Sequence, residues 1–129
     1  MRAIDTNVLV RLLVLDDSLQ WRAAEAYTAR GAWVSHLVLV ETIWVLEAVY
    51  RRGREQIAAA VEMLLQHEHL TIHEADVVDA ALAHFTGRGQ VDFSDCLQLE
   101  QARRAGHLPL GTFDRPLGRL AGAEHLTAE

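Results

Sequence analysis

Apolar residues recur in this chain in two patterns, short continuous runs and longer segments with helical periodicity. The clearest periodic segment contains Ile57, Val61, Leu64 and Leu65, which stand at i, i+4, i+7 and i+8. This spacing places all four side chains on one face of an α-helix. The pattern therefore predicts an amphipathic helix whose apolar face is buried against another part of the protein.

The same patterns predict that strands and helices alternate along the chain. We expect strands at residues 2–4, 33–34, 70–72 and 108–112. We expect helices at residues 8–15, 21–30, 36 to about 52, 57–65, 75–85 and 93–105. Three of these helices end at a glycine, Gly31, Gly53 or Gly106. Beyond residue 117 the pattern is weak, and Gly118 and Gly122 argue against one long helix there.

Short strands that alternate with helices pair in parallel through crossover connections. The chain is therefore expected to be an α/β protein, a three-layer α/β/α sandwich with a short central parallel sheet. In open parallel sheets, binding sites form beyond the carboxyl ends of the strands. Asp5 and Asp114 each follow a predicted strand directly. We expect both to line one crevice, although they lie at opposite ends of the sequence.

The size of the chain and its apolar content bound the domain organisation and the location. A length of 129 residues with 50% hydrophobic content fits a single domain, residues 1–129, around one core. The apolar runs are too short to span a bilayer, and Asp5 interrupts the N-terminus before a secretion signal could form. The single cysteine, Cys96, excludes an internal disulfide and a multi-cysteine zinc site. We expect a cytoplasmic protein that has no membrane partner.

The charge balance limits how the protein could bind nucleic acid. The formal net charge is −6, from 18 acidic and 12 basic residues, so the overall field would repel RNA or DNA. Any such contact must therefore be local. The basic residues are all arginine, whose planar guanidinium group suits phosphate recognition. GC-rich codon usage is the better explanation of that bias, because alanine and leucine are also abundant.

Four acidic residues stand at positions where a carboxylate is costly or unusual. Asp5 closes an apolar strand, Glu41 lies inside an apolar helix, Asp95 lies in the first turn of a helix, and Asp114 follows a late strand. Several carboxylates brought together repel one another until a divalent cation neutralises them. An all-oxygen ligand set favours hard cations such as Mg²⁺ and Mn²⁺. The four residues are thus the candidate metal ligands.

Glu41 is surrounded in sequence by apolar residues that cover nearly the whole circumference of the predicted helix. This pattern is typical of a helix packed on several sides, so we expect its carboxylate to be shielded from water. Two other interpretations stay open. Glu41 could point outward through a narrow gap in the packing, or it could pair with an arginine.

Two of the other acidic positions allow more than one interpretation. Asp92 lies three residues before Asp95 at a helix start, where an acidic residue is also an ordinary cap. Asp5, with Thr6 and Asn7, could cap the following helix, act as a nucleophile or bind a metal. A phosphatase of the haloacid dehalogenase type needs a second aspartate two residues after its nucleophile, and Asn7 occupies that position. The nucleophile hypothesis therefore loses most of its support.

Other polar residues offer weaker signals. His67, His69 and His73 could form another metal set, but their spacing alternates between strand faces and no carboxylate pattern joins them. We expect them to be surface histidines. Arg115, next to Asp114, is a candidate contact for a phosphate group.

Four short stretches of the sequence, found in order, resemble the PIN-domain nucleases. The closer similarity is to the VapC toxins of VapBC toxin-antitoxin pairs, and it covers nearly the whole chain. The stretches are Asp5-Thr6-Asn7, Ser35 with Glu41, Asp92-Phe93-Ser94-Asp95-Cys96-Leu97, and Thr112-Phe113-Asp114-Arg115.

The resemblance implies a site built from the four acidic residues. Asp5, Glu41 and Asp95 would hold Mg²⁺ or Mn²⁺, and Asp114 would complete the site. The polar residues beside them would orient the ligands or position the substrate. These flanking residues are Thr6, Asn7, Asp92, Thr112 and Arg115. Cys96 stands where the family usually has alanine.

The resemblance also implies an activity and partners. The protein would be a metal-dependent endoribonuclease that hydrolyses RNA phosphodiester bonds in line, with a metal-activated water as nucleophile. It would act as a homodimeric toxin, inhibited by an antitoxin whose C-terminal segment enters the acidic crevice. Two alternatives remain, a catalytically inactive or non-toxin PIN-like module that binds RNA, and a metal-dependent phosphatase of small molecules.

Overall fold

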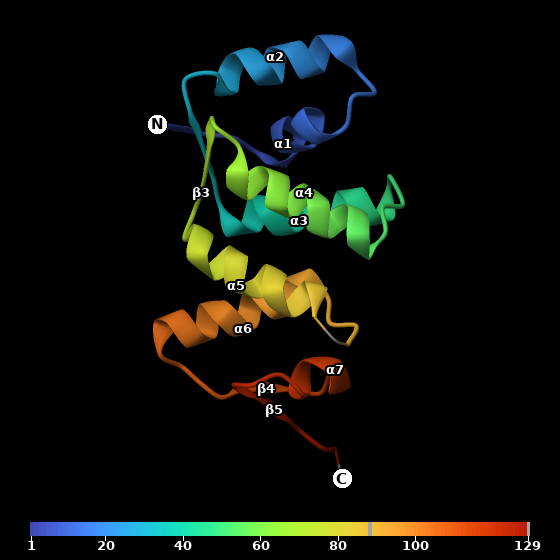
Figure 1. Cartoon of the computed structure of the whole chain (residues 1–129), viewed down its shortest axis with the longest axis vertical. Helices are drawn as coiled ribbons and strands as arrows, with labels where there is room; N and C mark the ends of the chain where they lie inside the picture. Colours follow the sequence, from blue (N-terminus) through green and yellow to red (C-terminus); the bar gives the residue numbers. More distant parts are fainter. Residues whose placement is uncertain (88, 129) are drawn as a thin grey trace. The chain divides into compact units, whose positions relative to one another are not determined.

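The strands of this protein fall into two sheets, one in each of two units of the chain. The computed structural model describes residues 1–87 and 89–128, and the chain divides into the units Met1–Ala75 and Asp76–Glu129 (Figure 1). Each sheet pairs its strands in parallel. The predicted α/β class with parallel strands is therefore confirmed. The prediction of a single domain stays a prediction.

The first unit contains a three-stranded parallel sheet with the order β1-β2-β3. Its strands are β1 (Arg2–Ala3), β2 (Ala32–Val34) and β3 (Leu70–Ile72). Each connection between neighbouring strands consists of two helices, in chain order α1 (Thr6–Leu13), α2 (Ser18–Thr28), α3 (His36–Ala48) and α4 (Arg54–Gln66). Because the strands are parallel, the residues that follow them, Asp5, Ser35 and His73, come after the carboxyl ends at one edge of the sheet.

Helix α4 has the buried face that its periodicity predicts. Ile57, Val61 and Leu64 are at most 2% exposed, whereas Met63 on the other side of the helix is 49% exposed. Burial of an aliphatic side chain of this size stabilises the fold by about 1.5–3 kcal/mol. The apolar face of α4 therefore holds the helix in the core of the first unit.

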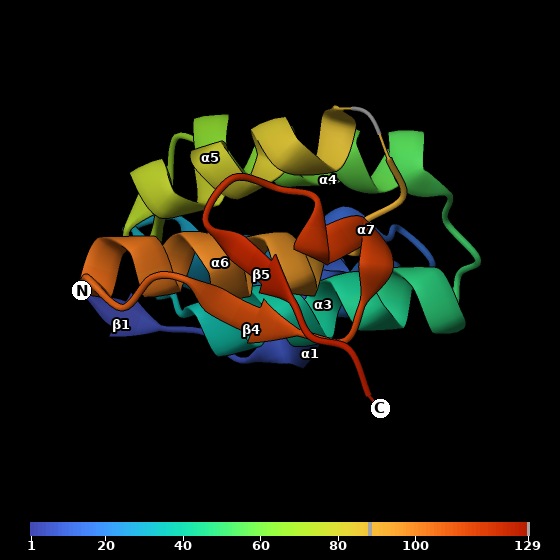
Figure 2. The same ribbon diagram turned by 90° about the horizontal axis from the view of Figure 1, so that it is seen from below.

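The second unit contains two long helices and a two-stranded parallel sheet. Helix α5 (Ala75–Thr86) begins at the boundary and is followed by α6 (Phe93–Ala105), and the rings of Phe85 and Phe93 meet edge to face at 5.7 Å. Strands β4 (Leu110–Thr112) and β5 (Ala123–His125) are joined by the short helix α7 (Arg115–Gly118), as Figure 2 shows. Thr112 pairs in register with His125.

The predicted elements agree with the structure best where the pattern is strong. The strand at 70–72 and the helix at 93–105 have the predicted bounds. The helix expected to reach about residue 52 ends at Ala48, and Arg51 has a φ of 53°, which a helix cannot contain. Helix α7 and strand β5 were not predicted, because four and three residues are too few to show periodicity.

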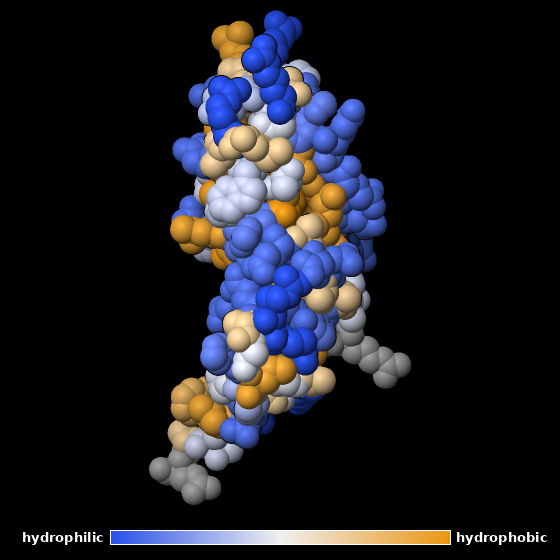
Figure 3. Space-filling view, turned by 90° about the vertical axis from the view of Figure 1, so that its left-hand side faces the viewer, coloured by the Kyte–Doolittle hydropathy of each residue, from blue (hydrophilic) through white to orange (hydrophobic). Residues whose placement is uncertain are grey.

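The surface of the described chain is mixed in character. On the face shown in Figure 3, hydrophilic side chains predominate and hydrophobic ones form small separate groups. Helices α3, α4 and α6 have 13 residues each. A bilayer requires about 20 apolar residues, and no helix in the described part of the chain is long and apolar enough to cross one.

Candidate functional site

Asp5 caps the first helix of the chain. Its Oδ1 accepts a hydrogen bond of 3.1 Å from the Val8 N–H, and its backbone is extended, as an N-cap requires. The capping interpretation of Asp5 is therefore correct. It does not compete with metal binding, because a carboxylate has two oxygens and the cap uses only Oδ1. The side chain is exposed beyond the end of β1, where a ligand can reach it.

Glu41 is held next to the start of α1 by Thr6. The Thr6 hydroxyl donates a hydrogen bond of 2.7 Å to Glu41 Oε2, across 35 positions in the sequence. Helices α1 and α3 pack against each other along this contact (Figure 1). Since Thr6 directly follows Asp5, the structure brings the region of Asp5 and the carboxylate of Glu41 together within the first unit.

The expectation that Glu41 is shielded from water is wrong. Glu41 is exposed, and on the same side of α3 Leu37 and Trp44 are 69% and 65% exposed. The helix buries only its opposite side, which includes Leu39 and Ile43. Apolar residues around the whole circumference of α3 predicted burial on all sides. Among the described elements of this unit, however, only one side of the helix packs against another element. Glu41 thus points outward, as one of the open interpretations allowed.

In the second unit, Asp95 lies close to two other carboxylates. Burial raises the pKa of Asp95 above 3.8, and the negative charges of Asp92 and Asp114 raise that pKa further. Such repulsion acts only between groups that are near each other. Asp92 and Asp114 therefore lie within electrostatic range of Asp95, although 22 positions separate Asp92 from Asp114.

The backbone around these acids explains how they are placed. Asp114 caps α7 through a 2.9 Å hydrogen bond from the Leu117 N–H to Oδ2, and Thr112 Oγ1 accepts a 3.0 Å hydrogen bond from the Asp114 N–H. Asp92 stands at the N-cap position of α6 but makes no capping hydrogen bond with its side chain. Asp92 therefore occupies the cap position without a side-chain capping hydrogen bond, and its carboxylate adds negative charge near Asp95.

The four predicted ligands divide into two pairs, one in each unit. Asp5 and Glu41 belong to the first unit, and Asp95 and Asp114 belong to the second. Within neither unit do three or more of the described His, Cys, Asp and Glu side chains form a group that could hold a metal ion by itself. The donor chemistry nevertheless suits Mg²⁺ or Mn²⁺, because carboxylate oxygens that repel one another favour a hard cation.

Asn7 lines a cleft between α1 and α2. The cleft has a volume of about 400 Å³, and Asp5, Arg11, Gln20 and Tyr27 also line it. Polar groups of this kind can hydrogen-bond a substrate. The position agrees with the expected substrate-positioning role of Asn7 without testing it.

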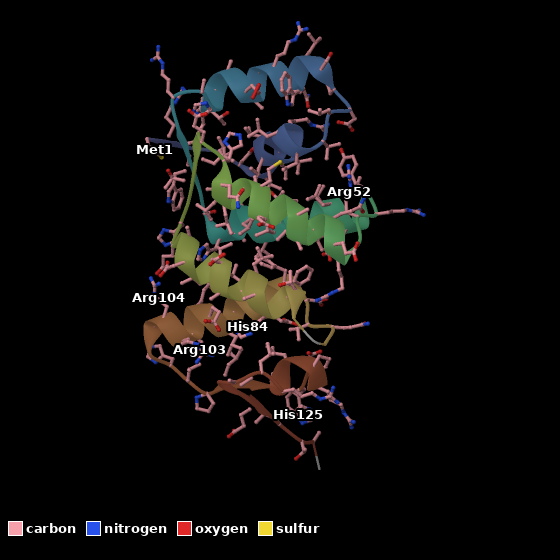
Figure 4. The ribbon with its side chains drawn as sticks, viewed as in Figure 1. Met1, Arg52, His84, Arg103, Arg104 and His125 are labelled. Carbon is pink, nitrogen blue, oxygen red and sulfur yellow. The ribbon has the colours of Figure 1, made fainter. Side chains whose placement is uncertain are left out.

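A buried polar network in the second unit was not anticipated from the sequence. Glu100 is 7% exposed and accepts hydrogen bonds from Arg103 Nε at 3.2 Å and 3.3 Å, while His84 Nε2 lies 3.0 Å from Glu100 Oε2. Figure 4 labels His84 and Arg103. One signal could have revealed it. Glu100 follows the buried residues Phe93 and Leu97 at i+7 and i+3, on the buried face of α6.

The three histidines considered as metal ligands are surface residues, as expected. His69 and His73 are exposed, and His67 is half-buried with its ring 5.9 Å from that of His69. His36 is instead the buried histidine of this unit, and its Nε2 lies 2.5 Å from the backbone oxygen of His73. Cys96 is also buried, which suits the small residue expected at its position.

Two comparisons with known proteins cover nearly the whole chain. The PIN domain family model matches residues 3–123, a range that contains all four predicted ligands. A VapC ribonuclease of Aquifex aeolicus (strain VF5) is 26% identical over 125 residues, which cover 93% of this chain and 92% of that protein.

Proposed function

The chain belongs to the PIN domain family, and on that premise we propose that it is a metal-dependent endoribonuclease. It hydrolyses RNA phosphodiester bonds and serves as the toxin of a type II toxin-antitoxin pair. The observation that carries the proposal is the environment of Asp95, whose pKa is raised by burial and raised further by the negative charges of Asp92 and Asp114. Crowded carboxylates of this kind are typical of a site that neutralises them with a divalent cation.

Asp5, Glu41, Asp95 and Asp114 are the residues that would hold Mg²⁺ or Mn²⁺. When bound, the ion would lower the pKa of a water molecule and offset negative charge on the reacting phosphate. Two of these residues lie in each unit.

Neighbouring side chains restrain these acidic residues through hydrogen bonds. Thr6 occupies Glu41 Oε2 with a hydrogen bond, which leaves Oε1 as the oxygen that would bind the ion. Thr112 restrains the backbone of Asp114 through its N–H. Hydrogen bonds of this kind fix the direction of a ligand and limit the entropy lost when a cation binds. No covalent enzyme intermediate is needed, and Asn7 stands where a second catalytic aspartate of a phosphatase would be.

The proposed partners follow from the same premise. The relative's name, VapC ribonuclease, supports RNA as substrate and a cognate antitoxin as protein partner. We further propose a homodimer that acts in the cytoplasm. Leu37 and Trp44 flank Glu41 on the exposed side of α3. An apolar surface beside a carboxylate is suited to contact with a protein partner.

An RNA cleavage assay tests the proposal. We expect the protein to cut single-stranded RNA with Mg²⁺ and to lose this activity in EDTA and on Asp95→Asn. The matched control is Asp79→Asn, which makes the same change at an exposed aspartate of α5 and should leave cutting intact. Cutting that persists in EDTA would reject the metal mechanism.

The two alternatives give different results in the same assay. An inactive RNA-binding module would bind RNA with and without Mg²⁺ and cut none. A small-molecule phosphatase would release phosphate from a simple ester such as p-nitrophenyl phosphate and leave RNA intact.

A further inference from the structure

The second unit carries a cationic pocket beside Asp114. Its volume is about 370 Å³, and its lining residues are Arg115, Gly118, Arg119 and His125. Among the residues that the structure describes, no acidic one lines this pocket, although the formal net charge of the chain is −6. In a protein whose overall field repels nucleic acid, such a local concentration of positive charge is where a phosphate can bind.

The two arginines of this pocket differ from the other described arginines of the unit. Arg103 pairs with Glu100, and Arg104 pairs with Asp76. Neither Arg115 nor Arg119 forms an ion pair within the described part of the chain. Both guanidinium groups are exposed, and their positions at i and i+4 place them on one side of α7 and its C-cap. They are therefore free to bind an anion.

The pocket depends on the close approach of α7 and β5, which Gly118 permits. A Cβ atom added to Gly118 would lie 2.7 Å from His125 Cβ, a distance that such atoms do not adopt. His125 lies beside α7 (Figure 4), and its Nε2 is 3.2 Å from the backbone oxygen of Phe113. The third polar group of the pocket is thus positioned by the packing and by this contact.

The pocket lies at the carboxyl end of its sheet. His125 pairs in register with Thr112, the last residue of β4, and Asp114 follows two residues later. Arg115 is the next residue after Asp114 and lines the pocket. A chain of phosphates that passes Asp114 would therefore meet the pocket next.

We propose that Arg115, Arg119 and His125 form a subsite for an RNA backbone phosphate next to the one that is cleaved. This inference rests on the proposed ribonuclease function and extends it. The guanidinium forks bind phosphate oxygens in pairs and do not read a base. The subsite therefore positions RNA without selecting its sequence.

Binding can be measured separately from cleavage. The Asp95→Asn protein holds RNA without cutting it, and its affinity for a fluorescein-labelled single-stranded oligoribonucleotide is measured by anisotropy at several salt concentrations. In that background we expect Arg119→Gln and Arg115→Gln each to weaken binding about tenfold. The slope of log K against log salt should fall by about 0.7 for each lost phosphate contact.

Two further variants separate charge from pocket shape. Arg30→Gln is the matched control, because Arg30 precedes β2 at the edge of its sheet opposite to Asp5, and we expect it to change neither affinity nor slope. Gly118→Ala keeps every charge but pushes His125 away, so it should weaken binding as the arginine variants do. Should it fail to fold, Arg119→Lys replaces it, and the salt slope of that variant should equal the parent's, because the charge is kept.

An unchanged affinity and slope in both arginine variants overturns the subsite. The subsite is also overturned if the arginine variants lose binding to polyglutamate but keep their binding to RNA, because that result would indicate an acidic protein partner. If the ribonuclease proposal fails, Asp95→Asn does not change RNA cutting. If only the subsite proposal fails, Asp95→Asn still abolishes RNA cutting.

Discussion

Thr6 Oγ1 donates a 2.7 Å hydrogen bond to Glu41 Oε2 and so connects the first turn of α1 with the middle of α3. Thr6 also follows Asp5, whose Oδ1 caps the same helix. Two carboxylates from distant parts of the sequence are therefore restrained by one short segment. The hydrogen bond occupies one oxygen of Glu41, and the proposed site uses the other.

Removal of the Thr6 hydroxyl should impair catalysis more than folding. Thr6→Val keeps the shape of the side chain and loses the donor, so we expect RNA cleavage at limiting Mg²⁺ to fall about 10–100-fold. Thr6→Ser keeps the donor and should retain most of the activity. The measurement is kcat/KM at several Mg²⁺ concentrations, and equal activity of the valine and wild-type proteins at all of them would contradict the role of Thr6.

The crowding at Asp95 predicts a dependence of stability on pH. The pKa of Asp95 is raised, so its ionised form is less favourable in the folded than in the unfolded state. Below pH 3.8 the group is protonated in both states and has no effect; as pH rises through the folded pKa, the folded protein loses stability. In EDTA, Asp95→Asn should therefore raise the melting temperature at neutral pH, and the gain should vanish on acidification toward pH 3.8.

The control for this prediction is Glu41→Gln. Glu41 is exposed, and glutamine keeps a side-chain oxygen that can accept the Thr6 hydrogen bond, so loss of the charge should change the metal-free melting temperature little. Thermal unfolding followed by circular dichroism across the pH range measures both variants. A gain at Asp95 that is the same at every pH would point to packing as its cause, since a repulsion between charges must disappear when they are protonated.

Metal binding should stabilise the protein. Mg²⁺ at about 100 times its Kd adds about 2.7 kcal/mol to the free energy of unfolding. We expect this increment to disappear in Glu41→Gln, from the first unit, and in Asp95→Asn, from the second. Titration of the melting temperature with Mg²⁺ tests this. An increment that survives in one of the two variants would exclude the substituted residue from the ligands of the ion.

The buried Glu100 network should contribute to the stability of the second unit. Arg103 donates two hydrogen bonds to Glu100 and a third, of 2.7 Å, to the backbone oxygen of Ala121. Arg103→Met removes these donors, and we expect it to lower the free energy of unfolding by about 1–3 kcal/mol. Urea denaturation measures the loss. The Arg104→Met variant is the matched control and should cost less, because the pair of Arg104 with Asp76 is more exposed.

The α/β/α fold class and the parallel pairing could be predicted from the sequence, because they depend on local patterns. The spacing of Ile57, Val61 and Leu64 in α4 predicts one buried face, which the structure contains. Asp95 could be identified as unusual because a polar group stands in the first turn of a helix among apolar neighbours. Local periodicity can be found in the order of the residues, and finding it does not require knowing which elements pack together.

The environment of Glu41 could not be predicted in the same way. Its apolar neighbours indicated burial, yet Leu37 and Trp44 share its exposed side. Whether an apolar face is covered depends on which element reaches it in space. The partners Thr6, for Glu41, and Asp114, for Asp95, likewise come from tertiary contacts.

The sequence by itself thus determined which residues are chemically unusual and in which elements they lie. Only the tertiary structure decided that Thr6 restrains Glu41 and that Arg119 and His125 line one pocket with Arg115. Only the structure, too, showed that Asp92 makes no capping hydrogen bond with its side chain. The physical reason is the separation along the sequence over which each kind of interaction acts. Helix and strand propensities act over a few neighbouring residues, whereas electrostatic repulsion and hydrogen bonding act between atoms that the folded chain brings together from far apart.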